Sequence, residues 1–256
     1  MKNTSSERRG RSAAVKILLG LGLSLCPAAE APTGQWILQQ VDANEVSNTR
    51  VVVSQMVVRL ARLSRTIRAK SWIAGTERSF TEFLAPEREK GTKMLKLGDE
   101  LWIYTPASDR TIKLSGHMLR QSVMGSDLSY EDMMEDNRLS AAYDAQVSGE
   151  DTLLDRACWV LDLVGRREDL AYSSRRIWVD KERFLVLRED RFAKSGTLLK
   201  TAEVASVSQQ SGRWVADRAV FRDMLKAGEG TEFILDSIAF DVPIPDYLLT
   251  KAALRK

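Results

Sequence analysis

Histidine and cysteine are scarce in this sequence of 256 residues, which contains one His and two Cys. One His excludes an HExxH zinc site, and Cys26 and Cys158 are too few for a multi-cysteine metal site. The sequence also has no GxSxG, GxxxxGKS/T or GxGxxG motif. These absences argue against the common hydrolases and nucleotide-dependent enzymes, so we expect no catalytic residue, no metal and no cofactor.

Long apolar runs are also missing, because Arg59 and Arg62 interrupt the best candidate after residue 31. The apolar stretch 17–25 follows a basic segment that ends at Lys16, and it is far shorter than the roughly 20 residues that span a bilayer. Small residues follow it, which is typical of an export signal. We therefore predict a signal peptide over 1–31 and one domain over 32–256. Cleavage after Ala28 or Ala31 stays open, as does lipidation of Cys26, although Leu25 precedes it where a lipoprotein signal has a small residue.

The formal net charge of +3 comes from 38 Lys and Arg against 35 Asp and Glu. The first 31 residues hold five of the basic residues and two of the acidic ones: Lys2, Arg8, Arg9, Arg11, Lys16, Glu7 and Glu30. Residues 32–256 therefore carry 33 basic and 33 acidic residues, which are interspersed. A balanced, dispersed charge gives no nucleic-acid footprint.

The chain after residue 31 has mainly β character. Residues 34–45 predict an amphipathic helix, and β-branched residues then favour strands. Strands are expected at 48–58, 66–74, 77–84, 92–97, 100–105, 110–115, 157–164, 175–179, 183–192, 197–208, 213–222 and 231–240. Gly98-Asp99 fits a two-residue hairpin turn, and the short turns between the later strands are typical of an antiparallel meander.

Residues 117–146 differ from the predicted strands, because they contain no run of β-branched residues apart from the single Val123. Ser126, Asp127 and Ser129 are good N-cap residues, and Glu131 and Asp132 suit the first turn of a helix. We predict one helix near 128–136, a second near 139–145 and a short helical tail after Pro245. Asp127, Glu131, Asp132, Glu135 and Asp136 lack the spacing of a calcium loop.

About eleven or twelve strands with two to four short helices predict a mainly β (α+β) fold. Such a long meander curls, so we expect a strongly curved antiparallel sheet or incomplete β-barrel with a few helices over it. Several strands are apolar on both faces, as in Leu101-Trp102-Ile103-Tyr104. Either helices cover the second face or it forms an apolar cavity for a lipid-like ligand. Met118, Met124, Met133 and Met134 fit both readings.

Neither His117 nor Cys158 lies in a sequence motif that is typical of a catalytic residue. No Ser or Cys motif accompanies His117, which favours a surface or capping histidine over a general base. Cys158 lies in an apolar strand, so we expect it to be buried and inert.

An ordered set of motifs over about 48–250 resembles one bacterial family, the LolA-like outer membrane lipoprotein-sorting proteins. The motifs are Phe83-Leu-Ala-Pro86, Lys90-Gly91-Thr92, Leu101-Trp102-Ile103-Tyr104-Thr105-Pro106, Arg110, Met124-Gly125-Ser126-Asp127, Glu131-Asp132, Ile177-Trp178-Val179-Asp180 and the segment 240–247. Val186 and the stretch 171–176 depart from the family pattern, and the chain resembles a non-classical branch rather than LolA itself.

The resemblance implies a periplasmic carrier or chaperone, not an enzyme, in which an incomplete barrel shields the acyl chains of a lipoprotein or lipid. It also implies an inner-membrane RND- or ABC-type transporter as partner, and we expect a monomer. The candidate lipid-binding residues are Phe80, Phe83, Met94, Trp102, Tyr104 and Trp178. The candidate lid junction is Met124, Gly125, Ser126 and Asp127. Opposite faces of one strand cannot both line a cavity, so some of the six cannot contact cargo.

Two other functions stay open from sequence. The same fold can serve a sensor or adaptor that binds a membrane regulator or RND-type exporter. A periplasmic hydrolase that uses His117 is the third alternative.

Overall fold

The computed structural model describes residues 31–45, 47–60, 63–135 and 138–255. Residues 32–256 form one compact unit. The proposed signal segment up to residue 30, including Cys26, lies outside the described residues, as does Asp136.

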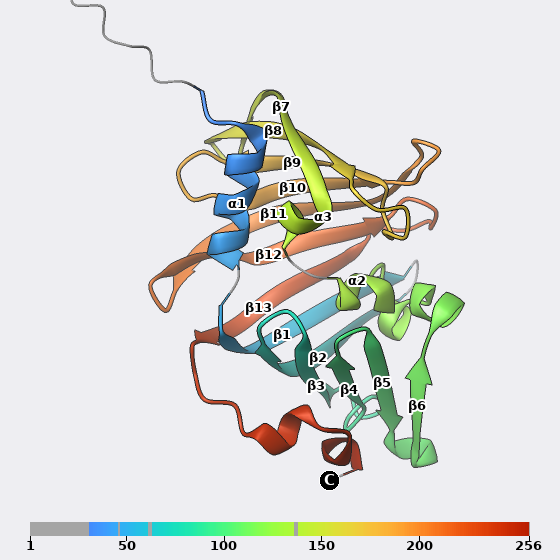
Figure 1. The fold of residues 1–256 in the computed structure, drawn as a ribbon. Coiled ribbons are helices and arrows are strands. Elements are labelled where there is room, and N and C mark those ends of the chain that lie inside the picture. Colours follow the sequence, from blue (N-terminus) through green and yellow to red (C-terminus); the bar gives the residue numbers. More distant parts are fainter. Residues whose placement is uncertain (1–30, 46, 61–62, 136–137, 256) are drawn as a thin grey trace, which may run out of the picture. The chain divides into compact units, whose positions relative to one another are not determined.

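One antiparallel sheet of thirteen strands dominates the described residues (Figure 1). The strands are β1 (Thr49–Leu60), β2 (Leu63–Ala74), β3 (Arg78–Ala85), β4 (Lys93–Leu97), β5 (Glu100–Thr105), β6 (Arg110–Leu114), β7 (Tyr143–Leu153), β8 (Arg156–Gly165), β9 (Ser174–Asp180), β10 (Val186–Phe192), β11 (Leu198–Gln210), β12 (Arg213–Asp223) and β13 (Thr231–Phe240). The spatial order is β6-β5-β4-β3-β2-β1-β13-β12-β11-β10-β9-β8-β7. The chain thus forms two meanders, β1–β6 and β7–β13, which pairing of β1 with β13 joins.

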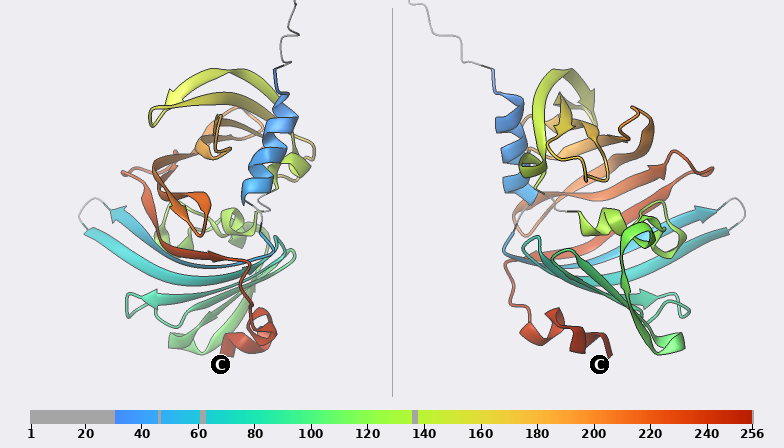
Figure 2. Two further views of the ribbon diagram at one scale, coloured as in Figure 1. Left: turned by 90° about the vertical axis from the view of Figure 1, so that its left-hand side faces the viewer. Right: turned by 45° about the vertical axis from the view of Figure 1, so that its right-hand side comes forward.

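The sheet is curved and does not close. Strands β6 and β7 are its two edges, since each has one neighbour in the strand order. The sheet bends around the short helix α2 (Tyr130–Met134) in the left view of Figure 2. This arrangement confirms the predicted mainly β fold, a strongly curved antiparallel sheet with a few helices.

Helices cover parts of one face, which we call the inner face. They are α1 (Gly34–Glu45), α2, α3 (Leu139–Ala142) and the 3-10 turns η2 (Gly116–Arg120) and η3 (Val123–Gly125). A further 3-10 turn, η1 (Pro106–Ser108), connects β5 to β6. The C-terminal segment forms η4 (Asp246–Leu249) and η5 (Lys251–Arg255), where the sequence predicted a short helical tail.

The predicted helix over 139–145 is wrong beyond Ala142, because β7 begins at Tyr143. The strand count is therefore thirteen rather than eleven or twelve. β7 is an edge strand whose side chains are mostly exposed, so its sequence is polar and carries few β-branched residues. The strand is defined by its pairing with β8, a long-range interaction without a local signal.

Two separate cores form on the inner face. Ile37, Leu38 and Val41 of α1 are fully buried against β7, β8 and β9. Gly34 permits this close packing, because a Cβ atom there would lie 2.6 Å from the carbonyl oxygen of Ala145. The second core lies between β1–β6 and the segment 116–134, which we call the lid. Helices cover the strip of sheet between the two cores incompletely. The cavity described below lies over this strip.

The C-terminal segment covers the opposite, outer face of β3–β5. Leu249, Ala253 and Leu254 pack against Phe80 and Leu95 in a third core. This apolar cover explains why these strands carry large apolar residues on both faces.

Removing one anchor of this tail tests its contribution to stability. Leu254 is 0% exposed, so Leu254→Ala should lower the free energy of unfolding by about 2–5 kcal/mol, measured by urea denaturation. The exposed neighbour provides the control, and Arg255→Ala should change it by less than about 0.5 kcal/mol. Equal effects of the two variants would contradict this account of the outer face.

Candidate functional site

A cavity of about 460 Å³ lies on the inner face between the two cores. Its floor is formed by β1, β2, β3, β12 and β13, and residues of α1, α2, η3 and the β9–β10 connection complete the wall. The wall is mainly apolar, with these residues among its members: Val52, Met56, Ile67, Ala69, Phe83, Val123, Phe221, Phe233, Leu235, Ile238 and Phe240. A cavity of this size and polarity suits an apolar ligand.

Strand alternation explains which side chains reach the cavity. Arg50, Val52, Ser54 and Met56 of β1 line it, whereas the intervening residues point to the outer face. Each position of β1 faces fixed partners in β2 and β13, so Met56 lies beside Ile67 and Phe233. The cavity therefore follows from the register across strands that lie far apart in the sequence.

The structure separates the six candidate lipid-binding residues. Phe83 lines the cavity. Met94 lies on the inner face in the buried core beneath the lid and is not among the lining residues. Phe80, Trp102 and Tyr104 belong to the outer-face core under the C-terminal tail.

Trp178 also lies apart from the cavity. It packs with Cys158, Leu185 and Leu187, and its indole nitrogen donates to Asp151 at 3.0 Å. Strand alternation gives the reason for both separations, since neighbours on one strand face opposite sides. Contact of any of the six with an acyl chain stays a prediction.

Sequence reasoning missed the largest share of the wall, which comes from β1, β12 and β13. Phe221 and Phe233 contact edge to face with ring centroids 6.4 Å apart, yet they lie on different strands. Each of them has one apolar and one charged neighbour on its strand, so the local pattern does not single out the buried face. No local signal could reveal that this face shares a cavity with β2 and β3.

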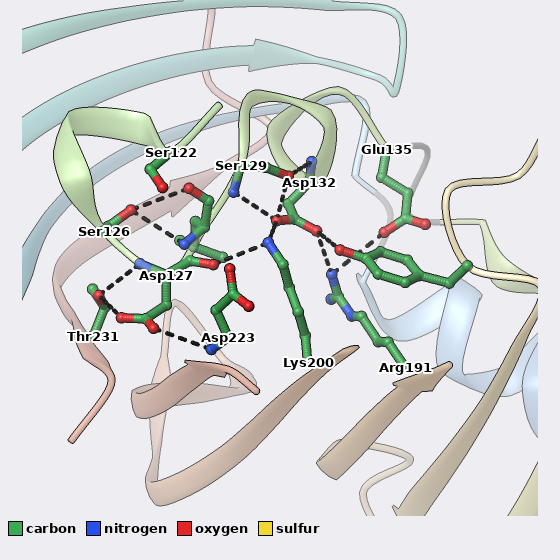
Figure 3. A network of polar contacts seen from close by, with 12 residues as sticks. Ser122, Ser126, Asp127, Ser129, Asp132, Glu135, Arg191, Lys200, Asp223 and Thr231 are labelled. Carbon is green, nitrogen blue, oxygen red and sulfur yellow. Dashed lines mark hydrogen bonds and ion pairs between the residues drawn. The ribbon is translucent and has the colours of Figure 1, made fainter. Parts of the chain in front are cut away.

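Asp127 fixes the lid to the strands of the C-terminal meander (Figure 3). Its carboxylate accepts hydrogen bonds from the Thr231 hydroxyl at 2.6 Å and from the Asp223 backbone N–H at 3.1 Å. Lys226 donates to the Ser122 hydroxyl at 2.6 Å and to the Ser126 carbonyl at 3.1 Å. The middle of the lid is thus tied to the end of β12, the turn after it and the start of β13.

Asp132 is the most highly connected group of the lid (Figure 3). It forms a capping box with Ser129 at the start of α2. Its carboxylate also accepts from Lys200 at 2.5 Å, from Arg191 at 3.0 Å and from the Tyr172 hydroxyl at 2.5 Å. Burial raises the pKa of Asp132, but the positive charges of Arg191 and Lys200 outweigh burial and lower it to about 2.

A buried ionic cluster continues from Asp132 along β9 and β10. Arg191 binds Glu189 at 2.8 Å, and Glu189 accepts from Arg175 at 2.5 Å. Arg175 also pairs with Glu135, just after α2. Burial raises the pKa of Glu189, but the positive charges of Arg191 and Arg175 outweigh burial and lower the pKa to about 2. The lid is therefore held by charge-assisted bonds around its whole C-terminal end.

The four candidate lid-junction residues lie together at η3 and the turn after it. Met124 and Gly125 have positive φ values of 50° and 74°, so the backbone reverses sharply there. Arg65 of β2 donates to the Met124 carbonyl, which joins this reversal to the N-terminal meander. Ser126 is buried, and Asp127 makes the contacts described above. Glycine at position 125 suits the left-handed conformation.

The lid methionines mainly seal the core. Met118, Met124 and Met134 pack against the core beneath the lid, whereas Met133 lines the cavity. The two sequence readings of these residues, core packing and contact with an apolar ligand, thus apply to different members.

One end of the cavity is charged. Glu45, the last residue of α1, and Arg50 near the start of β1 both line it. Arg50 donates from Nη1 to the Glu45 backbone carbonyl at 2.9 Å. Burial raises the pKa of the Glu45 carboxyl to about 7; the nearby Arg50 opposes this shift, and Glu189 and Asp42 add to it.

Groups considered for catalysis or metal binding are not assembled into a site in the described part of the chain. His117 is exposed in η2. Cys158 is fully buried, as predicted, and burial raises the pKa of its thiol. The described residues hold no cluster of three or more His, Cys, Asp or Glu that could bind a metal ion. No helix among them has the length and apolar character required to cross a membrane.

Comparisons with known proteins agree with this architecture. A family model described as "-like: Uncharacterized protein" matches residues 75–256. No curated protein matches the chain.

Three solved structures share the fold. A DUF1329 family protein from Desulfovibrio piger has a TM-score of 0.78 at 24% identity, covering 86% of this chain and 97% of its own. A domain from Vibrio parahaemolyticus named for outer membrane lipoprotein sorting has a TM-score of 0.74 at 22% identity, with coverages of 87% and 98%. A LolA superfamily protein from Nitrosomonas europaea has a TM-score of 0.70 at 24% identity, with coverages of 87% and 100%. The LolA-like resemblance seen in the sequence is thereby confirmed for the fold.

The first prediction concerns the lid. Asp132→Asn leaves Lys200 without its anionic partner and removes one of the carboxylates that pair with Arg191, so it should lower the free energy of unfolding by about 3 kcal/mol or more at pH 7. Because the pKa of Asp132 is lowered from 3.8 to about 2, the contribution is fully present above pH 3.8 and lost as the pH falls through about 2. Hydrogen exchange should show faster exchange over 122–134. Glu131→Gln is the adjacent control, and an equal effect there would contradict the assignment.

The second prediction concerns Glu45. Its pKa is raised from 4.5 to about 7, so the stability of the folded state falls as the pH rises through this interval. Glu45→Gln removes this pH-dependent loss of stability. It should therefore raise the melting temperature at pH 8 and leave it unchanged at pH 4. The exposed Glu87 supplies the control variant Glu87→Gln. A melting temperature of Glu45→Gln that is lower than that of the wild type at pH 8 would show that the ionised carboxylate is stabilising.

Proposed function

Because the chain belongs to the family whose model matches residues 75–256 and has the LolA-like fold, we propose that it is a periplasmic lipid or lipoprotein carrier. It shields acyl chains in the inner-face cavity during transfer toward the outer membrane. The observation that carries this proposal is the apolar cavity of about 460 Å³ between the sheet and the lid.

Burial of hydrocarbon supplies the driving force. Each acyl CH₂ removed from water contributes roughly 0.8 kcal/mol, so an acyl chain crosses an aqueous compartment only inside an apolar enclosure. Phe83, Phe221 and Phe233 provide such a wall, and Ala69 leaves room beside them. Cargo release then requires a membrane or partner that takes over this burial.

The lid gives the enclosure a way to open. Its bonds to the sheet are made by charged and polar groups, such as Asp127 with Thr231 and Asp132 with Lys200. Water can satisfy these groups when the lid moves, while exposure of the buried Val123 and Leu128 of the lid opposes opening. Met124 and Gly125, with their left-handed backbone, lie where the lid changes direction.

The remaining features of the proposal rest on the sequence and the fold. An N-terminal signal over 1–31 exports the chain, which acts as a monomeric, non-enzymatic chaperone and does not bind nucleic acid. An inner-membrane RND- or ABC-type transporter delivers the cargo. Crosslinking in cells followed by affinity purification tests this partner. A stable complex with a single-pass regulator, without lipid transfer between vesicles, would favour an adaptor instead.

Native mass spectrometry of protein purified from the periplasm tests the carrier function directly. We expect bound lipid or acylated peptide that organic extraction removes and that an apolar fluorescent probe replaces. Protein that is consistently empty and takes up no probe would overturn the proposal.

Filling the cavity provides the matched mutational test. Val52→Trp places an indole in the cavity and should weaken probe binding by about tenfold or more, because overpacking an apolar site costs one or more kcal/mol. Val53→Trp, one residue along β1, adds the same side chain to the outer face and should leave binding unchanged. Fluorescence titration measures both affinities, and equal losses would place the binding site elsewhere.

A further inference from the structure

The cavity changes from apolar to charged along strand β1. Met56, with Ile67 and Phe233 beside it, forms the apolar end beneath the lid. Arg50 lies six residues away, a distance of about 20 Å along an extended strand, where α1 ends at Glu45. A ligand that fills this space therefore contacts hydrocarbon at one end and two ionisable groups at the other.

No contact of the Glu45 carboxylate with the residues that the structure describes explains its position. It is an acid at the C-terminal end of a helix, where the backbone carbonyls already carry partial negative charge and where α1 has no basic residue in its last turn. Asp42, one turn earlier, accepts hydrogen bonds from the backbone N–H groups of Leu139 and Ser140, both at 2.9 Å. The Glu45 carboxylate, by contrast, accepts no hydrogen bond from the residues that the structure describes.

Arg50 is only partly engaged by the protein. Within the described part of the chain, its Nη1 atom bonds to the Glu45 carbonyl, and its other N–H groups have no hydrogen-bond partner. Burial lowers the pKa of Arg50, and the neighbouring Glu45 opposes this shift.

Two smaller cavities with charged residues in their walls share these residues. Glu45 also lines one of about 230 Å³ with Arg175, Glu189 and Arg191. Arg50 lines another of about 110 Å³ with Thr81 and Lys96. The charged groups next to the acyl-binding cavity are therefore not limited to Glu45 and Arg50.

We propose that the cargo is an amphiphile with a zwitterionic head group, whose cation contacts Glu45 and whose anion contacts Arg50 while its acyl chain extends toward Met56. This inference rests on the proposed carrier function and names the chemical class of its ligand. The two protein charges are opposite and adjacent, so a purely anionic head would meet Glu45, a purely cationic head would meet Arg50, and an uncharged head would leave both unpaired. A head group with a primary ammonium and a phosphate satisfies both.

Three probes with the same twelve-carbon acyl chain test the inference on delipidated protein at pH 8, below their micelle concentrations. They are lauroyl lysophosphatidylethanolamine, which is zwitterionic, lauroyl lysophosphatidylglycerol, which is anionic, and monolauroylglycerol, which is uncharged. Isothermal titration calorimetry should show the zwitterion binding about tenfold more tightly than the uncharged probe. Glu45→Gln should remove this advantage and leave the uncharged probe unaffected.

Two further variants assign the charges. Arg50→Gln should weaken the zwitterionic and anionic probes and leave the uncharged probe unaffected, with the melting temperature confirming the fold. Glu87→Gln, an exposed and distant acid, should change none of the three affinities. Equal binding of all three probes to the wild type, or tightest binding of the anionic one, would overturn the head-group inference while the carrier function stands. Failure of every probe to bind would overturn the carrier function itself.

Discussion

The structure depends on a mismatch between a large sheet and the small amount of helix that covers it. Thirteen strands present apolar side chains on the inner face, but α1 and the lid cover only the two ends of that face. Burying apolar surface is the main favourable term in folding, so the sheet curves to bring its own strands closer together. The strip of β1, β12 and β13 that remains between the two covers is where the cavity lies.

The lid is held over this strip by electrostatics rather than by apolar packing alone. Asp132, Arg191 and Glu189 are largely desolvated, and each is compensated by neighbours of opposite charge. Buried ion pairs of this kind contribute little net stability relative to apolar packing, but they are directional and fix one geometry. A cover that has to open and re-form in the same place is suited to such contacts. Tyr172 and Arg175 of the stretch 171–176, which we predict to depart from the family pattern, belong to this cluster.

The pair Glu45–Arg50 differs from that cluster because, among the described residues, its one hydrogen bond runs to the Glu45 backbone carbonyl and not to the carboxylate. Charged groups at the wall of a cavity cost folding free energy unless something compensates them. Proteins keep such groups where a ligand completes the interaction, and the adjoining cavities, whose walls carry charged residues, provide the space for a head group. The apolar and charged ends of one cavity thus match the two parts of an amphiphile.

Much of this architecture could be predicted from local sequence. Strand-forming residues and the turns between them located twelve of the thirteen strands. The spacing of Trp36, Ile37, Gln40 and Val41 located α1, although its buried face is Ile37, Leu38 and Val41 and Trp36 is exposed. Ser129 and Asp132 predicted the start of a helix, and the capping box is present. These features depend on interactions within a few residues, which is why the sequence reveals them. The edge strand β7 lacked that local signal, because its pairing with β8 defines it.

The composition by itself determined a balanced, mainly β chain with apolar residues on both faces of its strands. Only the tertiary structure decided which face became core and which became cavity, so that Phe83 lines the cavity while Phe80, three residues earlier, lies under the C-terminal tail. The physical reason is register. Alternation along a strand places neighbouring side chains on opposite faces of the sheet. The long-range pairing of β1 with β13 and the position of the C-terminal tail decide what packs against each face.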